Sequence, residues 1–176
     1  LATVAPDDSP TNGIISKFTS KSFFFANDEM MFDQSGGSNA WPTDEYLNIW
    51  VCDLLGNKIG YAQLPGGGAY NTDGIVIDYL AFGRTYNSSK YGLGRTVTHE
   101  VGHWLNLRHI WGDGNCEKDD YVSDTPKSNY PSFGCQPRKT TCGTLDMIAN
   151  FMDYSNDICM NLFTKGQKVR MRSLFS

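Results

Sequence analysis

The sequence has little charge and lacks any long hydrophobic run. Asp, Glu, Lys and Arg make up 19% of the 176 residues, below the usual share, and the formal net charge is only −4. No stripe of basic residues interleaves with aromatic residues, so we expect no nucleic-acid partner. The apolar stretch 75–82 is interrupted by Asp78 and is far too short to cross a bilayer, so we expect no membrane partner. Hydrophobic residues make up 40%, which is typical of a globular protein.

The sequence also lacks the C-x-x-C pairs that are typical of structural zinc sites. Four of its five cysteines crowd between Cys116 and Cys159, which fits an oxidising compartment better than a cytosol. We therefore expect a secreted, extracellular protein with two disulfides, and a structural zinc site is the competing interpretation. The fifth cysteine, Cys52, is either a buried small hydrophobe or the former partner of a cysteine upstream of Leu1. The sequence does not open with a charged segment followed by an apolar one, and Leu1 stands in place of an initiator Met, so we expect a processed or excised product.

The length of 176 residues is that of one ordinary domain, and short β-branched and aromatic runs in the first half predict strands. Residues 46–52 are nearly all apolar, which predicts a central strand that is buried on both faces. Residues 60–64 are a shorter extended run before Pro65 and three glycines, which is typical of an edge strand. Residues 74–82 are the third strand candidate, and residues 1–39 are predicted to be mostly loop with short extended pieces.

Helical spacing of apolar residues predicts a helix over about 95–105. Thr164 and Gln167 form the pattern of a capping box, which predicts a second helix near the C-terminus. We expect this helix to pack rather than to take part in catalysis; it runs through Val169, Met171, Leu174 and Phe175. Between the two helices, about forty residues after His109 show no periodicity, which indicates a functional or cross-linked region.

All three histidines of the chain fall within the segment HEVGHWLNLRH, residues 99–109. His99 and His103 lie four residues apart, so on a helix their imidazoles project from one face. A continued helix would turn His109 away from them, so the helix must end near Asn106 if all three are to meet. Asn adopts the left-handed conformation that ends helices more readily than other non-glycine residues. Three imidazoles leave the fourth position of a tetrahedral zinc ion open for water, which is typical of a catalytic site.

Glu100 follows His99 directly, so its carboxylate can reach the water on the metal. We expect it to act as the general base, which takes a proton as the water attacks a carbonyl and delivers it to the leaving amine. An ordinary surface glutamate is the alternative, but a helix that only supplies zinc ligands has no need of an acid there. The pattern therefore predicts zinc-dependent hydrolysis.

The zinc segment, followed downstream by a methionine-containing turn at Asn150–Tyr154, resembles the signature of the metzincin clan. Asn106 stands where glycine is most frequent in the clan, and Arg108 is an unusual neighbour for the last ligand; both affect the geometry of the turn without removing a ligand. Further segments, in matching order and spacing, resemble the pappalysin family, which includes secreted endopeptidases; they are residues 46–53, 60–67, 123–126 and 150–167.

This resemblance implies an α/β, metzincin-like catalytic domain over residues 1–176. It implies a twisted mixed sheet, an antiparallel edge strand, a zinc helix beneath the sheet, and a loop-rich C-terminal subdomain over about 107–176. Relatives begin with a strand, a long helix and another strand that this sequence lacks. By resemblance, Met152 is an apolar floor beneath the zinc and Tyr154 stabilises the oxyanion. Taken alone, either residue could simply belong to the core.

The resemblance also implies an endopeptidase that acts on proteins or peptides. Its edge strand would hold the substrate through main-chain hydrogen bonds; the residues are Gly60, Tyr61, Ala62, Gln63 and Leu64. Asp157 matches an acidic position that selects Arg or Lys, which implies cleavage on the amino side of these residues. The alternative for Asp157 is a capping or surface residue.

The family pattern pairs Cys116 with Cys142 and Cys135 with Cys159, whereas spacing alone leaves the pairing open. Acidic residues crowd the loop after the third histidine, which suits calcium; they are Asp113, Glu117, Asp119, Asp120 and Asp124. Because relatives bind calcium here, we expect Asp120 and Thr125 to be ligands, against the alternative of a solvated acidic loop.

Two other functions stay open from the sequence. One is a catalytically inactive, zinc-stabilised protein-binding module, which would have no need of Glu100 and Tyr154. The other is zinc-dependent hydrolysis of a non-peptide amide, against which the edge strand argues. We expect the protein to be a monomer.

Overall fold

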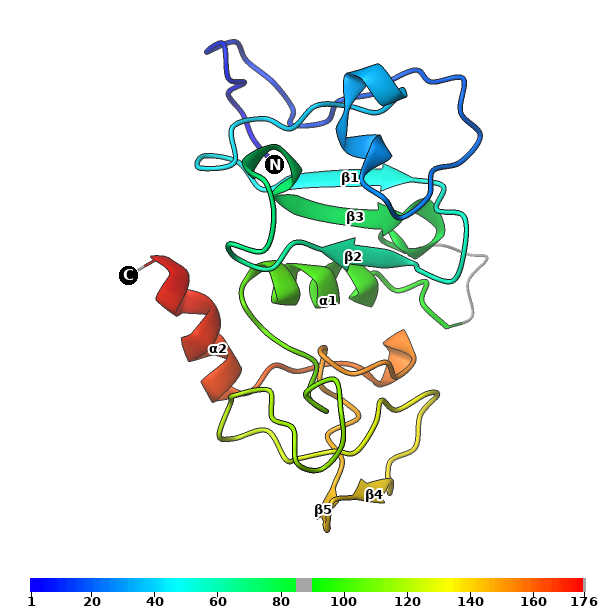
Figure 1. Ribbon diagram of the computed structural model, residues 1–176, viewed down its shortest axis with the longest axis vertical. Coiled ribbons are helices and arrows are strands. Elements are labelled where there is room, and N and C mark those ends of the chain that lie inside the picture. The colour runs from blue at the N-terminus through cyan, green and yellow to red at the C-terminus, as the bar shows by residue number, and fades with distance from the viewer. Residues whose placement is uncertain (85–89, 176) are drawn as a thin grey trace. The chain divides into compact units, whose positions relative to one another are not determined.

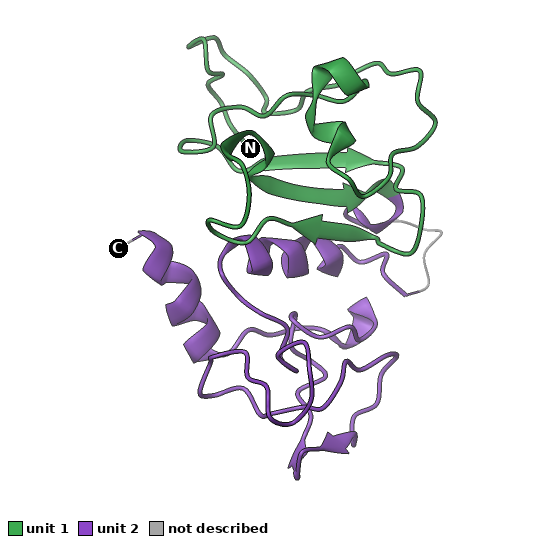
Figure 2. Ribbon diagram, viewed as in Figure 1, with its two compact units in different colours: residues 1–79 green, residues 80–176 purple. Residues whose placement is uncertain are grey.

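The computed structural model describes residues 1–84 and 90–175, and the chain divides into two compact units (Figure 2). Unit 1 comprises Leu1–Tyr79 and unit 2 comprises Leu80–Ser176. Unit 1 carries the larger sheet, whereas unit 2 carries the two α-helices (Figure 1). The assignment of residues 1–176 to a single catalytic domain stays a prediction. Within the described residues, no helix is long and apolar enough to cross a membrane.

A mixed three-stranded sheet lies at the centre of unit 1. Its order is β1 (Asn48–Cys52), β3 (Gly74–Asp78) and β2 (Gly60–Ala62). Strand β1 runs parallel to β3, and β2 runs antiparallel to β3 with Gly60 opposite Ile77. The predicted mixed sheet with a short antiparallel edge strand is therefore confirmed.

The central strand is β3, and the prediction that residues 46–52 form a central strand buried on both faces was wrong. All five residues of β3 are buried, as expected for a strand with a neighbour on each side. In β1, Trp50 is buried, whereas Ile49 and Val51 are 41% and 43% exposed. Strand β1 thus has the alternating burial of a strand with one packed face. The sequence of β1 does not show this alternation, because the residues at the exposed positions, Ile49 and Val51, are also apolar.

The core of unit 1 lies on the packed face of β1. Met30 and Met31 come from the short 3-10 helix η1 (Glu29–Met31) and pack with Phe24, Trp50 and Val76. Other 3-10 turns are η2 (Asp33–Ser35), η3 (Tyr70–Thr72) and η4 (Tyr79–Ala81). The segment 1–39 is otherwise mostly loop, as predicted.

Unit 2, which includes the last two residues of η4, next forms α1 (Arg95–Trp104), within one residue of the predicted zinc helix. It continues with a hairpin and further helices: β4 (Thr140–Thr141), β5 (Thr144–Leu145), η5 (Asp157–Cys159), α2 (Lys165–Arg172) and η6 (Ser173–Phe175). The predicted capping box opens α2, because Thr164 Oγ1 accepts the Gln167 N–H at 3.0 Å and Gln167 Oε1 accepts the Thr164 N–H at 2.9 Å.

The C-terminal helix packs against its own unit with only some of its apolar side chains. Val169 and Phe175 are 70% and 73% exposed, and Leu174 is 39% exposed. Only Met171 of the four packs against the core cluster of this unit, whose members are Leu107, Ile110, Trp111 and Met152. Gln167, by contrast, is completely buried. Helix α2 therefore meets its own unit largely through polar side chains.

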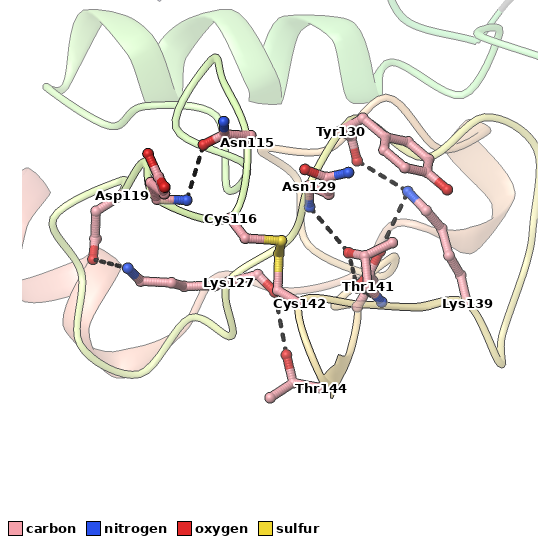
Figure 3. Close-up of a disulfide and its surroundings, with 12 residues drawn as sticks. Asn115, Cys116, Asp119, Lys127, Asn129, Tyr130, Lys139, Thr141, Cys142 and Thr144 are labelled. Atoms are coloured by element: carbon pink, nitrogen blue, oxygen red, sulfur yellow. Dashed lines mark hydrogen bonds and ion pairs between the residues drawn. A yellow bond between two sulfur atoms is a disulfide. The ribbon is translucent and has the colours of Figure 1, made fainter.

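Two disulfides hold the region without periodicity. They join Cys116 to Cys142 and Cys135 to Cys159, with Cα atoms 5.4 Å and 5.9 Å apart, as the family resemblance implied. Around the first disulfide, side chains bond to backbone groups of neighbouring loops (Figure 3). There, Thr144 Oγ1 donates to the Lys127 carbonyl, and Thr141 Oγ1 accepts the Asn129 N–H. Cross-links and such bonds thus replace regular structure here.

Cys52 is a free thiol that is partly buried in β1. Burial raises the pKa of this thiol to about 11, so it stays protonated near neutral pH. Both interpretations of Cys52, a small hydrophobe in its strand and the former partner of a cysteine upstream of Leu1, stay predictions.

Candidate metal centre

Helix α1 ends where the metal ligands require it to end. Asn106 has φ = 69°, in the left-handed region, and its N–H donates to the His103 carbonyl at 2.8 Å. The chain then turns back, and the Leu107 N–H donates to the Gly102 carbonyl at 2.9 Å. As a result, His109 Nε2 lies 3.1 Å from His103 Nε2. Asn106 thus has the left-handed conformation that was predicted for the residue at the end of this helix.

A main-chain carbonyl orients each of the two helical histidines. His99 Nδ1 lies 2.7 Å from the Phe151 carbonyl oxygen, and His103 Nδ1 lies 3.0 Å from the Leu107 carbonyl oxygen. A carbonyl oxygen only accepts hydrogen bonds, so Nδ1 carries the proton in both neutral rings. Nε2 of His99 and of His103 is then left with a free lone pair.

The third histidine is oriented by a carboxylate. His109 Nδ1 lies 2.5 Å from Asp113 Oδ1, which assigns its proton to Nδ1 by the same argument. The ring also stacks on Trp111, with centroids 4.2 Å apart and planes 8° from parallel. A carboxylate behind a histidine ligand is the usual support of a metal site. From sequence, Asp113 stood only among the acidic residues of the calcium loop, although its position four residues after His109 could have indicated this role.

The three imidazoles converge on one point that suits a cation. One nitrogen from each of His99, His103 and His109 lies within 4.8 Å of the others. Burial lowers the pKa of His99 well below its ordinary value and lowers that of His103 to about 4, so these rings are neutral at neutral pH. Two lone pairs facing each other at 3.1 Å repel unless a positive charge lies between them. Three neutral nitrogen donors in this arrangement fit zinc.

Glu100 and Tyr154 lie beside the histidines. Glu100 is buried on α1, one residue after His99. The Tyr154 ring centroid lies 5.7 Å from that of His99 and 5.0 Å from that of His109. Burial, and next the negative charge of Glu100, raises the pKa of Tyr154 to about 12. The Tyr154 hydroxyl therefore keeps its proton near neutral pH and can donate a hydrogen bond.

Met152 packs directly against α1. Its side chain is completely buried in the cluster with Leu107 and Trp111. Gly102 permits this approach, because a Cβ at that position would collide with Met152 Sδ. The structure thus places Met152 against the helix that carries two of the three candidate ligands.

Asp153 was missed by sequence reasoning. It is 1% exposed, and its Oδ1 accepts the N–H groups of Ser132 at 2.8 Å and of Tyr154 at 2.9 Å. This buried carboxylate therefore holds the backbone of Tyr154 in place. An Asp inside a polar turn gave no sign of burial in the sequence.

Asp157 lies at the start of α1. It is 3% exposed, and its Oδ2 accepts the N–H groups of Leu93 at 2.8 Å and of Arg95 at 3.1 Å. The helix N-cap, Gly94, has no side chain for this purpose, so Asp157 supplies the cap from a distant part of the sequence. The capping alternative is therefore observed, and among the described residues the Asp157 carboxylate takes part in no ion pair.

The two expected calcium ligands lie together. Thr125 Oγ1 lies 2.8 Å and 2.9 Å from the two Asp120 carboxylate oxygens and 2.6 Å from the Val122 carbonyl oxygen. The hydroxyl of Thr125 has one proton and can donate a well-aligned hydrogen bond to only one of these three oxygens. Burial raises the pKa of Asp120 to about 6.

The expected substrate strand lies in unit 1. Gly60, Tyr61 and Ala62 form β2, and the Gln63 N–H extends the pairing to the Gly74 carbonyl at 3.1 Å. Leu64 follows as a partly exposed residue. Within the described residues, β2 has a strand neighbour on one side only, as an edge strand must.

Comparison with known proteins gives consistent results. The family Peptidase_M43, described as pregnancy-associated plasma protein-A, matches residues 31–176. An extracellular metalloprotease of Colletotrichum graminicola is 42% identical and covers 86% of this chain. Extracellular metalloprotease 1 of Coccidioides posadasii is 40% identical over 73% of this chain. The chain spans 64% and 49% of these two relatives, about half the length of the second.

Among solved structures, mature mirolysin of Tannerella forsythia in complex with a cleaved peptide is similar with a TM-score of 0.95. The two chains are 49% identical, and the match covers 99% of this chain and 69% of the other. Mirolysin in complex with a small compound gives a TM-score of 0.95 at 50% identity. The metzincin-like fold is therefore established, and the chain belongs to the pappalysin family of metalloproteases, Peptidase_M43.

Proposed function

We propose that this protein is a secreted zinc-dependent endopeptidase that hydrolyses internal peptide bonds. The observation that carries the proposal is the convergence of three neutral imidazoles beside a buried glutamate and a protonated tyrosine. The relatives are named extracellular metalloproteases, and the related mirolysin was solved with a cleaved peptide. The pairing of four of the five cysteines in two disulfides also favours secretion.

In this proposal, His99, His103 and His109 hold the zinc. When bound, zinc lowers the pKa of a water molecule and polarises the substrate carbonyl. Glu100 takes the proton of the attacking water and passes it to the leaving amine. Tyr154 donates a hydrogen bond to the carbonyl oxygen as negative charge develops on it. Met152 supports α1 from below, and Asp113 fixes the direction of the His109 ring.

Metal dependence tests this function. The purified protein should contain about one zinc per chain and should cleave casein. Removal of the metal with a chelator should abolish cleavage, and added zinc should restore it. Cleavage that persists in the fully metal-free protein would refute the proposal.

The same assay separates the two alternatives. An inactive zinc-stabilised binding module would bind zinc and leave casein intact. A hydrolase of non-peptide amides would also leave casein intact but would release product from small amide substrates. Buried Glu100 next to His99 favours catalysis over simple metal-dependent folding.

We further propose that the free side of β2 pairs with the backbone of the substrate. An edge strand offers unpaired N–H and carbonyl groups, which hold an extended peptide in antiparallel orientation. Asp157 would then select Arg or Lys on the carboxyl side of the cleaved bond. The Asp157 carboxylate is buried and forms no ion pair with the described residues. This supports the proposal, because the Arg or Lys side chain of a substrate would neutralise the buried charge. We propose that the enzyme acts as a monomer.

A calcium ion bound by Asp120 and Thr125 is a further part of the proposal. The crowding of acceptor oxygens around one hydroxyl supports it, because a cation satisfies them all. Calcium should therefore raise the melting temperature of the wild-type protein. Asp120→Asn should lose most of this increase, whereas Glu117→Gln, in the same acidic loop, should keep it.

The effect of calcium should depend on pH. Without the ion, the fold favours protonated Asp120, whose pKa is raised from 3.8 to about 6. The resulting stability is complete below the unfolded pKa and is lost as the pH rises through about 6. Calcium needs the ionised carboxylate, so the increase in Tm should be larger at about pH 8 than at about pH 5. Equal increases at both values would contradict the assignment of Asp120.

A further inference from the structure

Two completely buried side-chain amides connect α2 to the turn that contains Met152. Asn150 Nδ2 donates to Gln167 Oε1 at 2.8 Å, and Gln167 Nε2 donates to Asn150 Oδ1 at 3.1 Å. Asn150 Oδ1 also accepts the Met152 N–H at 2.9 Å. This bond from Asn150 to the Met152 N–H spans Phe151 and constrains its backbone. The carbonyl of Phe151 is the group that orients His99.

Arg170 makes a second connection from the same helix. It lies three residues after Gln167, so both side chains leave one face of α2. Arg170 Nε donates to the Asn106 carbonyl at 2.6 Å, and its Nη2 lies 3.4 Å from Asn106 Oδ1. Asn106 is the left-handed residue that ends α1. Its neighbour Leu107 supplies the carbonyl that orients His103.

The two connections thus follow the same plan. One connection runs from α2 to Asn150, the residue before Phe151, and the other runs from α2 to Asn106, the residue before Leu107. The carbonyls of Phe151 and Leu107 each accept the Nδ1 proton of one helical histidine. Hydrogen bonds are directional, so these polar contacts, which are buried at Gln167 and partly buried at Arg170, fix the two turns more narrowly than apolar packing would. The burial pattern agrees, because Gln167 is completely buried while Val169 is 70% exposed.

We infer that α2 is a positioning element of the metal centre, in which Gln167 acts on His99 and Arg170 acts on His103. Gln167 acts through Asn150 and the Phe151 carbonyl, and Arg170 acts through Asn106 and the Leu107 carbonyl. This inference rests on the proposed metal site. It assigns to the C-terminal helix a function in metal affinity in addition to its contribution to folding.

The test measures zinc affinity of the metal-free chain by competition with a chromophoric chelator. Gln167→Met and Arg170→Met keep most of the side-chain length but remove the hydrogen bonds. Each should weaken zinc binding by about tenfold to a hundredfold, as loss of outer-sphere partners does at other metal sites. The matched controls, Lys168→Ala and Val169→Ala on the exposed side of α2, should stay within about twofold of wild type.

Two further measurements separate positioning from simple loss of fold. The visible spectrum of the cobalt-substituted protein should change in the Gln167 and Arg170 variants and not in the controls, because it reports ligand geometry. Thermal melting of the metal-free proteins shows which variants fold. If Gln167→Met does not fold, Gln167→Glu decides, since it keeps the acceptor for Asn150 Nδ2 and, when ionised, replaces the returning bond with a repulsive contact between two oxygen acceptors.

Folded variants with wild-type zinc affinity and an unchanged cobalt spectrum would overturn the inference. A wild-type chain that binds zinc but leaves casein intact would refute the proposed function and leave this inference in place. Failure of the proposed metal site has a different signature, because the wild-type chain itself would then bind no zinc. That outcome would remove the basis of both proposals.

Discussion

Replacing Glu100 with Gln is expected to lower kcat/KM for peptide cleavage by about a hundredfold to ten-thousandfold, the usual contribution of a general base. The amide has nearly the same shape but cannot accept a proton from the attacking water. Zinc content should stay at the wild-type level, because the three imidazoles and their orienting oxygens are unchanged. The measurement is steady-state cleavage of a fluorogenic peptide, with zinc determined on the same samples.

His109→Ala is the matched control for this experiment. It removes a ligand and should lose both zinc and activity, whereas Glu100→Gln should lose activity alone. Full activity in Glu100→Gln would end the proposed mechanism. It would also leave the buried position of Glu100 without a catalytic explanation.

Asp157→Asn is expected to reduce cleavage before Arg and Lys by about a hundredfold relative to cleavage before apolar residues, since a buried charge pair loses one partner. The substituted amide oxygen can still accept the N–H groups of Leu93 and Arg95, so the cap of α1 is kept. Kinetics on a peptide library that varies the residue after the cleaved bond would measure the change.

Asp157→Ala serves as the comparison, because it removes both the charge and the cap. It should show the same change of preference and, in addition, a lower Tm than Asp157→Asn. An unchanged preference in both variants would assign Asp157 to capping alone. The only role of Asp157 would then be to accept the N–H groups of Leu93 and Arg95 through its Oδ2.

Much of the site could be predicted because its ligands lie in one short segment. The spacing of His99 and His103 depends only on helix geometry, and Asn106 marked the end of the helix. The capping box at Thr164 was equally local, and it correctly located the start of α2. Such features depend on neighbours within one turn, which a sequence displays directly.

The remaining features depend on contacts between distant segments. Asn150 and Gln167 form a buried pair across a separation of 17 residues, and nothing in either local pattern indicates a partner. Asp157 caps a helix that starts 62 residues earlier. Burial of β1 was misjudged because both of its faces are apolar, so composition could not show which face packs. Polar groups that find tertiary partners are invisible to rules based on periodicity.

The most direct test of the account is diffraction from crystals grown with zinc, with data collected at the zinc absorption edge. One anomalous peak is expected at about 2.0–2.1 Å from the Nε2 atoms of His99, His103 and His109, the usual zinc–nitrogen distance. No further side chain of this protein should bind the ion. A peak away from these three nitrogens, or a fourth protein ligand that closes the site, would contradict the account.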